Sequence, residues 1–127
     1  MVICIDDLLG IPYKTNGRDK DGYDCMGLTI EVEKRFGHTL VDLEENKLKD
    51  RSFQQLANKT IPLMNIKQID KPTTPGDMVL FLDNSGLLHH IGVYLGNDMF
   101  IHCDFRGVHI DRFNKYPDRI GRIYTWL

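Results

Sequence analysis

The stretch Tyr23-Asp24-Cys25-Met26-Gly27-Leu28 lies where a polar loop changes into a segment with helical periodicity. Residues 16–22 are rich in turn formers, whereas apolar residues after Cys25 recur on one face of a 3.6-residue period. Asp24 is a favoured N-cap residue and predicts a helix over about residues 25–36. A thiol in the first turn experiences the positive helix end, which favours the thiolate. The stretch therefore predicts a nucleophilic cysteine, with a buried core cysteine as the alternative.

The composition is typical of a globular domain. The chain has 127 residues, of which 42% are hydrophobic and 27% charged, with a net charge of -2. This length favours one domain over residues 1–127. The balanced charge shows no electrostatic footprint for nucleic acid. No apolar run is long enough to span a membrane, and no secretory signal is recognisable, so we expect a protein made in the cytoplasm without a membrane partner.

The cysteines give no metal or disulfide pattern. The chain has three of them, Cys4, Cys25 and Cys103, an odd number without close spacing. We expect reduced thiols, with Cys4 and Cys103 as apolar filler, and a protein that needs no metal or other cofactor.

The first half of the chain favours helices. Residues 2–9 have the pattern of a short amphipathic helix ended by Gly10. The proline at position 12 stiffens the next loop and presents Tyr13. Residues 43–58 indicate a second, charged surface helix, and residues 59–71 are irregular, with room for a short edge strand.

From Pro75 onward the pattern changes to a period of two, which is typical of strands. Helices followed by an antiparallel meander define an α+β domain. The expected strands are residues 78–82, 90–95, 99–103, 108–111 and 122–126.

The hairpin of the second and third strands decides whether two histidines share a face. A three-residue loop pairs Leu95 with Met99 and hence Gly92 with His102. His102 then lies diagonal to His90, about 7–8 Å away at the backbone. A two-residue loop would put the histidines on opposite faces. The first register predicts that His102 contacts one nitrogen of His90 while the other nitrogen faces outward.

Together with Cys25, the two histidines match the nucleophile, base and orienting group of a thiol hydrolase. Cys25 is the expected nucleophile, His90 the general base and acid, and His102 the group that fixes the tautomer of His90. Gly92 leaves room for a close approach of the cysteine helix.

The remaining histidines have simpler interpretations. Of the adjacent His89 and His90, only one side chain points inward from a strand. We expect His38 and His109 to be solvated.

Five short motifs follow one another in a fixed order: residues 10–14, 24–28, 75–81, 90–97 and 100–102. Together they resemble the NlpC-type cell-wall peptidase family of the papain-like superfamily. The resemblance implies a papain-like α+β core with the cysteine helix packed on an antiparallel sheet. It also implies cleavage of peptidoglycan stem peptides, often at the γ-D-glutamyl bond to a diamino acid.

The resemblance assigns roles by position. It carries the catalytic roles over to Cys25, His90 and His102. Tyr13 matches a tyrosine that lines the site, and Asp24 matches an aspartate that helps to hold substrate. Family members usually have a serine after the cysteine, where Met26 stands here, so Met26 is a third substrate-binding position with altered recognition. The backbone N–H of Cys25 is the expected oxyanion donor.

Two other functions remain open beside the cysteine peptidase. In the first, the chain is a catalytically weak or inactive structural or assembly component of a phage tail with the same fold. In the second, it transfers an acyl group to an amide outside the cell wall. Compact members resemble tail-associated lysins of phages or prophages, by analogy only. We therefore expect peptidoglycan stem peptides and phage tail proteins as partners, and delivery to the cell wall with a virion.

Overall fold

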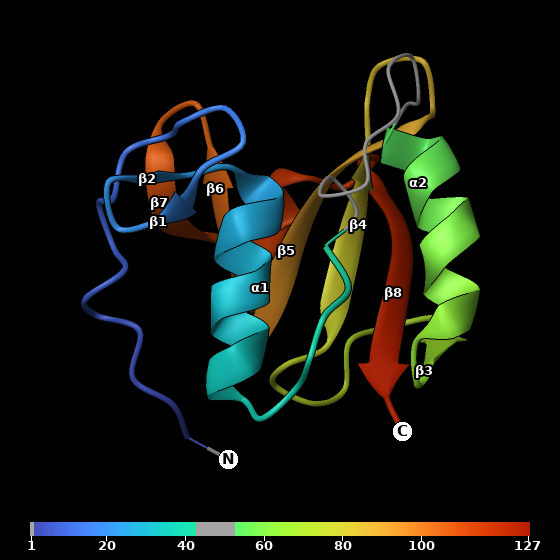
Figure 1. Cartoon of the computed structure of the whole chain (residues 1–127). Helices are drawn as coiled ribbons and strands as arrows, with labels where there is room; N and C mark the ends of the chain where they lie inside the picture. The colour runs from blue at the N-terminus through green and yellow to red at the C-terminus, as the bar shows by residue number, and fades with distance from the viewer. Residues whose placement is uncertain (1, 43–52) are drawn as a thin grey trace.

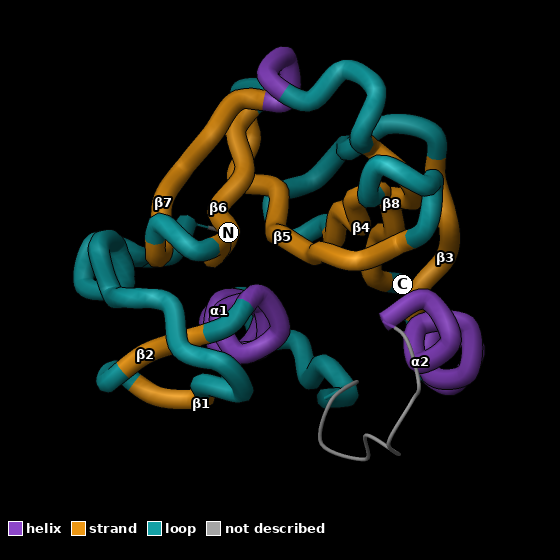
Figure 2. Tube along the Cα trace, turned by 90° about the horizontal axis from the view of Figure 1, so that it is seen from above, coloured by secondary structure: helices purple, strands orange, loops and turns teal. Residues whose placement is uncertain are grey.

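The computed structural model describes residues 2–42 and 53–127, and both of its α-helices lie on one side of an antiparallel sheet (Figures 1 and 2). None of the described helices is long and apolar enough to cross a membrane. The elements are β1 (Arg18–Asp19), β2 (Gly22–Tyr23), α1 (Cys25–Arg35), α2 (Phe53–Thr60), the 3-10 helix η1 (Ile61–Leu63), β3 (Ile66–Ile69), β4 (Met78–Leu82), β5 (Leu88–Gly96), β6 (Met99–Asp104), β7 (Gly107–Arg112), the 3-10 helix η2 (Phe113–Lys115) and β8 (Ile120–Trp126).

Helix α1 begins at Cys25, as predicted. The side chain of Asp24 accepts a hydrogen bond from the backbone N–H of Gly27, and basic residues occupy the last turn, where they suit the negative helix end. The apolar face of α1 packs on the central strands. The buried cluster there consists of Leu8, Tyr23, Leu28, Val32, Phe36, Val93, Ile101, Cys103 and Val108.

The sheet has the strand order β3-β8-β4-β5-β6-β7, and every neighbouring pair is antiparallel. The predicted meander is confirmed for β4 to β7. The last strand, β8, pairs with β4 on the side away from β5. The short strand β3 forms the edge of the sheet next to β8, and it lies within residues 59–71, where a short edge strand was expected.

The turn between β5 and β6 is shorter than expected. Gly96 pairs with Met99, and only Asn97 and Asp98 lie between them, with φ angles of 54° and 62°. Two successive positive φ angles are typical of a two-residue hairpin turn that follows the strand twist. The expected pairing of Leu95 with Met99 is therefore wrong.

A bulge in β5 compensates for the shorter turn. The register shifts between Tyr94 and Gly96, so Leu95 is an extra residue with no counterpart in β6. Below the bulge Gly92 pairs with His102, as predicted. The extra residue thus restores the side-chain parity that a two-residue turn alone would have reversed.

The N-terminal segment does not form the expected helix. Residues 6–10 form turns, and the N–H of Leu8 donates to the carbonyl of Ile5 at 2.9 Å. The N–H of Gly10 donates to Val108 of β7 at 2.9 Å. The backbone is therefore held by the sheet edge, and tertiary pairing outweighs the amphipathic pattern.

Two further segments differ from the sequence expectation. Of the predicted helix over residues 43–58, the part up to residue 52 lies outside the described residues, and α2 continues to Thr60. The polar loop before Cys25 contains the short hairpin of β1 and β2, which the turn-rich composition did not indicate.

A buried carboxyl group ties α1 to the last strand. Glu33 is fully buried, and it hydrogen-bonds His38 Nδ1 at 3.0 Å and Trp126 Nε1 at 3.2 Å. Burial raises the pKa of Glu33 to about 8 and lowers the pKa of His38, so both are neutral near pH 7 and the Glu33 carboxyl donates to His38. His38 also stacks on Trp126 at a centroid distance of 4.5 Å, so its expected solvation is wrong.

Glu33 predicts a pH-dependent stability. It ionises at lower pH in the unfolded chain than in the fold, so the free energy of unfolding should fall as pH rises from about 4.5 to about 8. Glu33→Gln keeps a neutral side chain with the same donor and acceptor, and it should remove this contribution. Between these two pH values, the difference in the free energy of unfolding between the wild type and Glu33→Gln should change by a few kcal/mol at most. One pKa unit is worth about 1.4 kcal/mol. Urea denaturation at both pH values measures it, and a constant difference would contradict the prediction.

Candidate active site

Cys25 and His90 line one cavity of about 430 Å³ at the N-terminal end of α1. Cys25 is half-buried, as is His90, whereas the neighbouring His89 is exposed. The structure therefore brings the predicted nucleophile and base together, and only one of the two adjacent histidines points inward. The cavity lies at the end of the sheet where β5 begins and β6 ends, and Asp104 and Phe105 also line it.

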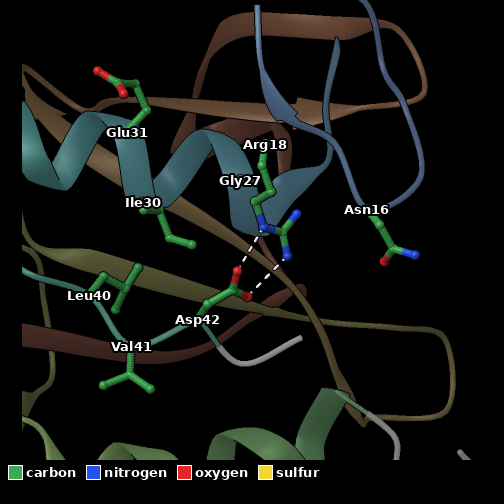
Figure 3. Close-up of a pocket in the computed structure, with 8 residues that line it drawn as sticks. All are labelled: Asn16, Arg18, Gly27, Ile30, Glu31, Leu40, Val41 and Asp42. Atoms are coloured by element: carbon green, nitrogen blue, oxygen red, sulfur yellow. Dashed lines mark hydrogen bonds and ion pairs between the residues drawn. The ribbon is translucent and has the colours of Figure 1, made fainter. Parts of the chain in front are cut away.

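The start of α1 is fixed by a charged network, of which Figure 3 shows the pair of Arg18 and Asp42. Asp24 Oδ1 accepts from the N–H of Gly27 and from Arg18 Nη1, both at 2.7 Å. Arg18 in turn donates to both carboxylate oxygens of Asp42, at 2.8 and 3.0 Å. Asp24 also lines the cavity, but one of its oxygens is committed to holding the helix. Its predicted role in substrate binding stays a prediction.

A larger cavity of about 690 Å³ runs along another side of α1, past Gly27, Ile30 and Glu31 (Figure 3). Neither Cys25 nor His90 lines it, and Arg18 is paired there with Asp42. The larger cavity thus holds no nucleophile, and we place the chemistry in the smaller cavity.

The loop that carries Tyr13 is fixed by the strand before the cysteine. Tyr23 donates its N–H to the carbonyl of Pro12 at 3.1 Å and accepts from the N–H of Lys14 at 3.0 Å. Tyr13 is 44% exposed and lines the Cys25 cavity, in the place the sequence predicted.

Met26 differs from its expected place. It is fully buried in the cluster with Met78, Leu80 and Ile91, and it is not among the residues that line the Cys25 cavity. One step along a helix turns a side chain by about 100°, which directs Met26 into the core instead of the cavity. The structure therefore does not support Met26 as a substrate contact.

Gly92 also has a different role from the expected one. A Cβ atom at this position would approach the carbonyl of Ile101 to 3.0 Å and the Cβ of His102 to 3.2 Å. The space beside Gly92 is therefore filled by β6. The glycine accommodates the close approach of β6, and not that of the cysteine helix.

His90 and His102 are hydrogen-bonded through their rings, with 2.8 Å between His90 Nε2 and His102 Nδ1. His102 is buried and packs on Phe100 at a centroid distance of 4.5 Å. Burial, with a smaller effect of the neighbouring rings, lowers the pKa of His90 to about 3, so the ring is neutral near pH 7. The predicted contact between the two histidines is present.

Behind His102 lies Asp111, which the sequence analysis did not single out. Its Oδ2 lies 2.9 Å from His102 Nε2, and the residue is only 5% exposed. Four further groups bond the same carboxylate: His109 Nε2 at 3.0 Å, the Tyr116 hydroxyl at 2.9 Å, Lys115 Nζ at 3.1 Å and Arg106 Nη2 at 3.4 Å. Although burial opposes ionisation, the hydrogen bonds from His102, Lys115 and Tyr116 hold the pKa of Asp111 well below its ordinary range. The expected solvation of His109 is therefore wrong.

The strand pattern held a signal for this network. The two-residue turn after Asp104 pairs His102 with His109 and Phe100 with Asp111. Polar residues two apart on a strand share a face, so the histidine and aspartate of β7 necessarily face His102.

Asp111 sets the tautomers of both histidines. An ionised carboxylate only accepts, so His102 Nε2 carries a proton and donates to it. Burial lowers the pKa of His102 despite the opposing effect of Asp111, so its Nδ1 is unprotonated and accepts from His90 Nε2. The remaining nitrogen of a neutral His90, Nδ1, then carries a lone pair, which is what a general base requires.

His102, His109 and Asp111 also offer three ligand atoms within 4.8 Å of one another. However, Lys115 Nζ and Arg106 Nη2 lie 3.1 and 3.4 Å from the Asp111 carboxylate. These cations already neutralise the carboxylate and would repel a metal ion. The set fits a hydrogen-bond network better than a metal site.

The other two cysteines have contrasting environments. None of the three is disulfide-bonded. Cys103 is buried, donates to the carbonyl of Tyr23 at 3.1 Å and has its pKa raised to about 12 by burial, which confirms it as core filler. Cys4 is exposed, so the same expectation was wrong for it.

A cysteine at the start of a helix and a histidine from the antiparallel sheet behind it, lining one cavity, define a papain-like α+β fold. Residues 10–119 match the NlpC/P60 family, and the chain belongs to that family. The predicted fold class and family are confirmed.

Three curated relatives illustrate the family. The chain is 29% identical over 105 residues to the gamma-D-glutamyl-L-lysine dipeptidyl-peptidase of Bacillus subtilis (strain 168), covering 81% of this chain and 31% of that protein. It is 32% identical over 120 residues to the probable endopeptidase p60 of Listeria grayi, covering 91% and 20%. It is 30% identical over 111 residues to the murein DD-endopeptidase MepS/murein LD-carboxypeptidase of Escherichia coli (strain K12), covering 86% and 51%.

Solved structures agree on the fold. An NlpC/P60 family protein from Bacillus cereus ATCC 10987 superposes with a TM-score of 0.70 at 25% identity, over 94% of this chain and 37% of that one. The NlpC/p60 domain of the peptidoglycan hydrolase SagA has a TM-score of 0.59 at 19% identity, over 91% and 87%, and supports the fold alone. The chain spans between about a fifth and about a half of the curated relatives described above.

The tautomer assignment can be measured directly. Imidazole ¹⁵N NMR near pH 7 should show His90 and His102 neutral and protonated on Nε2, because Asp111 accepts from His102 and His102 accepts from His90. Asp111→Ala removes the acceptor and should give His102 a mixture of tautomers. Asp118→Ala, at an exposed position, serves as control. A proton on His90 Nδ1 in the wild type would contradict the assignment.

Proposed function

We propose that this domain is a cysteine peptidase that hydrolyses amide bonds of peptidoglycan stem peptides, of the γ-D-glutamyl-diamino acid type. The observation that carries the proposal is the cavity shared by Cys25 and His90, with His90 held by His102. Family membership supports it, as do relatives named as peptidases and endopeptidases. One of them is named for a gamma-D-glutamyl-L-lysine bond.

In the first half of the reaction His90 Nδ1 takes the proton from the thiol of Cys25. The thiolate attacks the carbonyl carbon of the substrate, and the oxyanion is stabilised at the positive end of α1, where the backbone N–H of Cys25 lies. The C–N bond then breaks as His90 gives its proton to the departing amine. The acyl group remains on Cys25 as a thioester.

The second half returns the enzyme to its starting state. His90 removes a proton from a water molecule, and the resulting hydroxide attacks the thioester carbon. The C–S bond breaks, the acid product leaves, and the proton returns to Cys25. His102 keeps Nε2 of His90 occupied in both halves, so Nδ1 is always the nitrogen that exchanges protons with the cavity.

The remaining parts of the proposal concern binding and place of action. Tyr13 and Asp24 line the cavity of Cys25, and we propose that they contact the acyl side of the substrate. We propose that the domain acts at the cell wall. Association with a phage tail stays a prediction from the sequence.

Substitution of the proposed nucleophile and base tests the reaction. Cys25→Ala and His90→Ala should each lower the release of cleaved muropeptides from purified peptidoglycan by at least about a thousandfold, since each removes a reacting group. His102→Ala should retain more activity, with a loss of roughly a hundredfold, because His102 orients without reacting. Mass spectrometry of the products measures the rates.

The exposed Cys4→Ala variant is the matched control and should cleave like the wild type. Equal product from Cys25→Ala and the wild type would end the proposal.

Thiol alkylation tests the activation of Cys25 without a substrate. With iodoacetamide, Cys25 should react faster than Cys4 and at lower pH, because it lies at a helix N-terminus and shares its cavity with the His90 imidazole. Cys103 should resist modification, since burial raises its pKa to about 12. Peptide mapping of the labelled protein between about pH 5 and pH 9 assigns each rate. The same pH profile for Cys25 and Cys4 would show that Cys25 is not activated.

A further inference from the structure

A second, smaller cavity continues the groove on the far side of His90. Its volume is about 230 Å³, and it shares His89, His90, Asp104 and Phe105 with the cavity of Cys25. Beyond these shared residues it extends over Phe81 and Tyr116 to Arg119, and Cys25 does not line it. The two cavities therefore form one groove that crosses over the His90 ring.

The proposed chemistry gives this groove a direction. His90 protonates the departing amine, so the part of the substrate that follows the scissile bond must lie on the His90 side of Cys25. The acyl part occupies the cavity that contains Tyr13 and Asp24. The smaller cavity is then the place of the residue that carries the departing amine. This step rests on the proposed function.

Arg119 brings a positive charge to the smaller cavity. Its backbone is held on both sides, since its N–H donates to the carbonyl of Tyr116 at 3.1 Å and its carbonyl accepts from Leu82 at 2.7 Å. Its guanidinium is exposed and donates to the side-chain oxygen of Asn84, which is uncharged. One such bond leaves most of the five N–H donors of a guanidinium for a ligand.

The other arginine near this rim is neutralised. Arg106 forms an ion pair with Asp104 at 2.8 Å, and this pair neutralises the charge of both side chains. Within residues 2–42 and 53–127, no carboxylate forms an ion pair with Arg119. Arg119 is thus the cation in this cavity that has no anionic partner among the described residues, and a guanidinium binds a carboxylate in a two-point geometry.

We propose that the smaller cavity binds the residue that carries the departing amine, and that Arg119 selects a residue with a carboxylate on its side chain. Phe81, Phe105 and Tyr116 supply the apolar walls for the methylene groups of that side chain. Among diamino acids, diaminopimelate has such a carboxylate at the end of its side chain, whereas lysine has a hydrogen atom in the same place.

Two peptides that differ only in this group test the inference. L-Ala-γ-D-Glu-diaminopimelate and L-Ala-γ-D-Glu-L-Lys are compared by kcat/KM for the wild type. We expect the carboxylate peptide to be preferred by at least about tenfold, in line with a charge-assisted hydrogen bond. Arg119→Gln should bring the ratio close to one, and Arg119→Lys should leave an intermediate ratio.

Arg122→Gln is the matched control, since Arg122 also donates to an asparagine oxygen, that of Asn58, and lines neither cavity of the groove. It should keep the wild-type ratio. Equal rates on the two peptides in the wild type, or an unchanged ratio in Arg119→Gln, would overturn this inference and leave the peptidase intact. No cleavage of either peptide by the wild type would overturn the proposed function and the inference with it.

Discussion

The bulge at Leu95 determines which side chains of β5 and β6 meet. With a two-residue turn and no bulge, every residue of β5 before it would face the opposite side of the sheet relative to β6. The extra residue cancels that reversal and pairs Gly92 with His102. The ring contact between His90 and His102, the packing of His102 on Phe100 and the position of both rings relative to α1 all depend on this one offset.

The carboxylate of Asp111 fixes the direction of the hydrogen bonds on the face of the sheet that carries the His90 and His102 rings. It collects donors from β7 and from the segment that follows, and through His102 it decides which nitrogen of His90 faces the cavity. A base whose protonation site is set from behind does not need the substrate to orient it. The thiol comes from the opposite side of the sheet, on a helix that Asp24 and Arg18 hold at its first turn.

Local signals predicted a large part of this arrangement. An N-cap aspartate before a periodic segment is sufficient to place Cys25. A continuous apolar run identified β4, and the period-two pattern after it identified β5 to β7. The pairing of Gly92 with His102 was predicted correctly, but from a three-residue loop. The structure reaches the same pairing with a two-residue turn and a bulge, which the sequence did not reveal because a bulge has no clear sequence signature. Met26, Gly92 and the N-terminal segment were misplaced because their surroundings come from distant parts of the chain. Asp111 was overlooked although its strand was expected.

The hydrogen bonds of Tyr23 have a consequence for how the groove meets its ligand. Its N–H and carbonyl hold the Tyr13 loop, the same carbonyl accepts from Cys103 of β6, and the next residue caps the helix of Cys25. The Tyr13 loop, β6 and the start of α1, which each contribute lining residues to the cavity of Cys25, are thereby joined through one residue. A displacement of Tyr23 would therefore move Tyr13, Cys25 and Cys103 together, so the shape of the cavity depends on one position in the backbone.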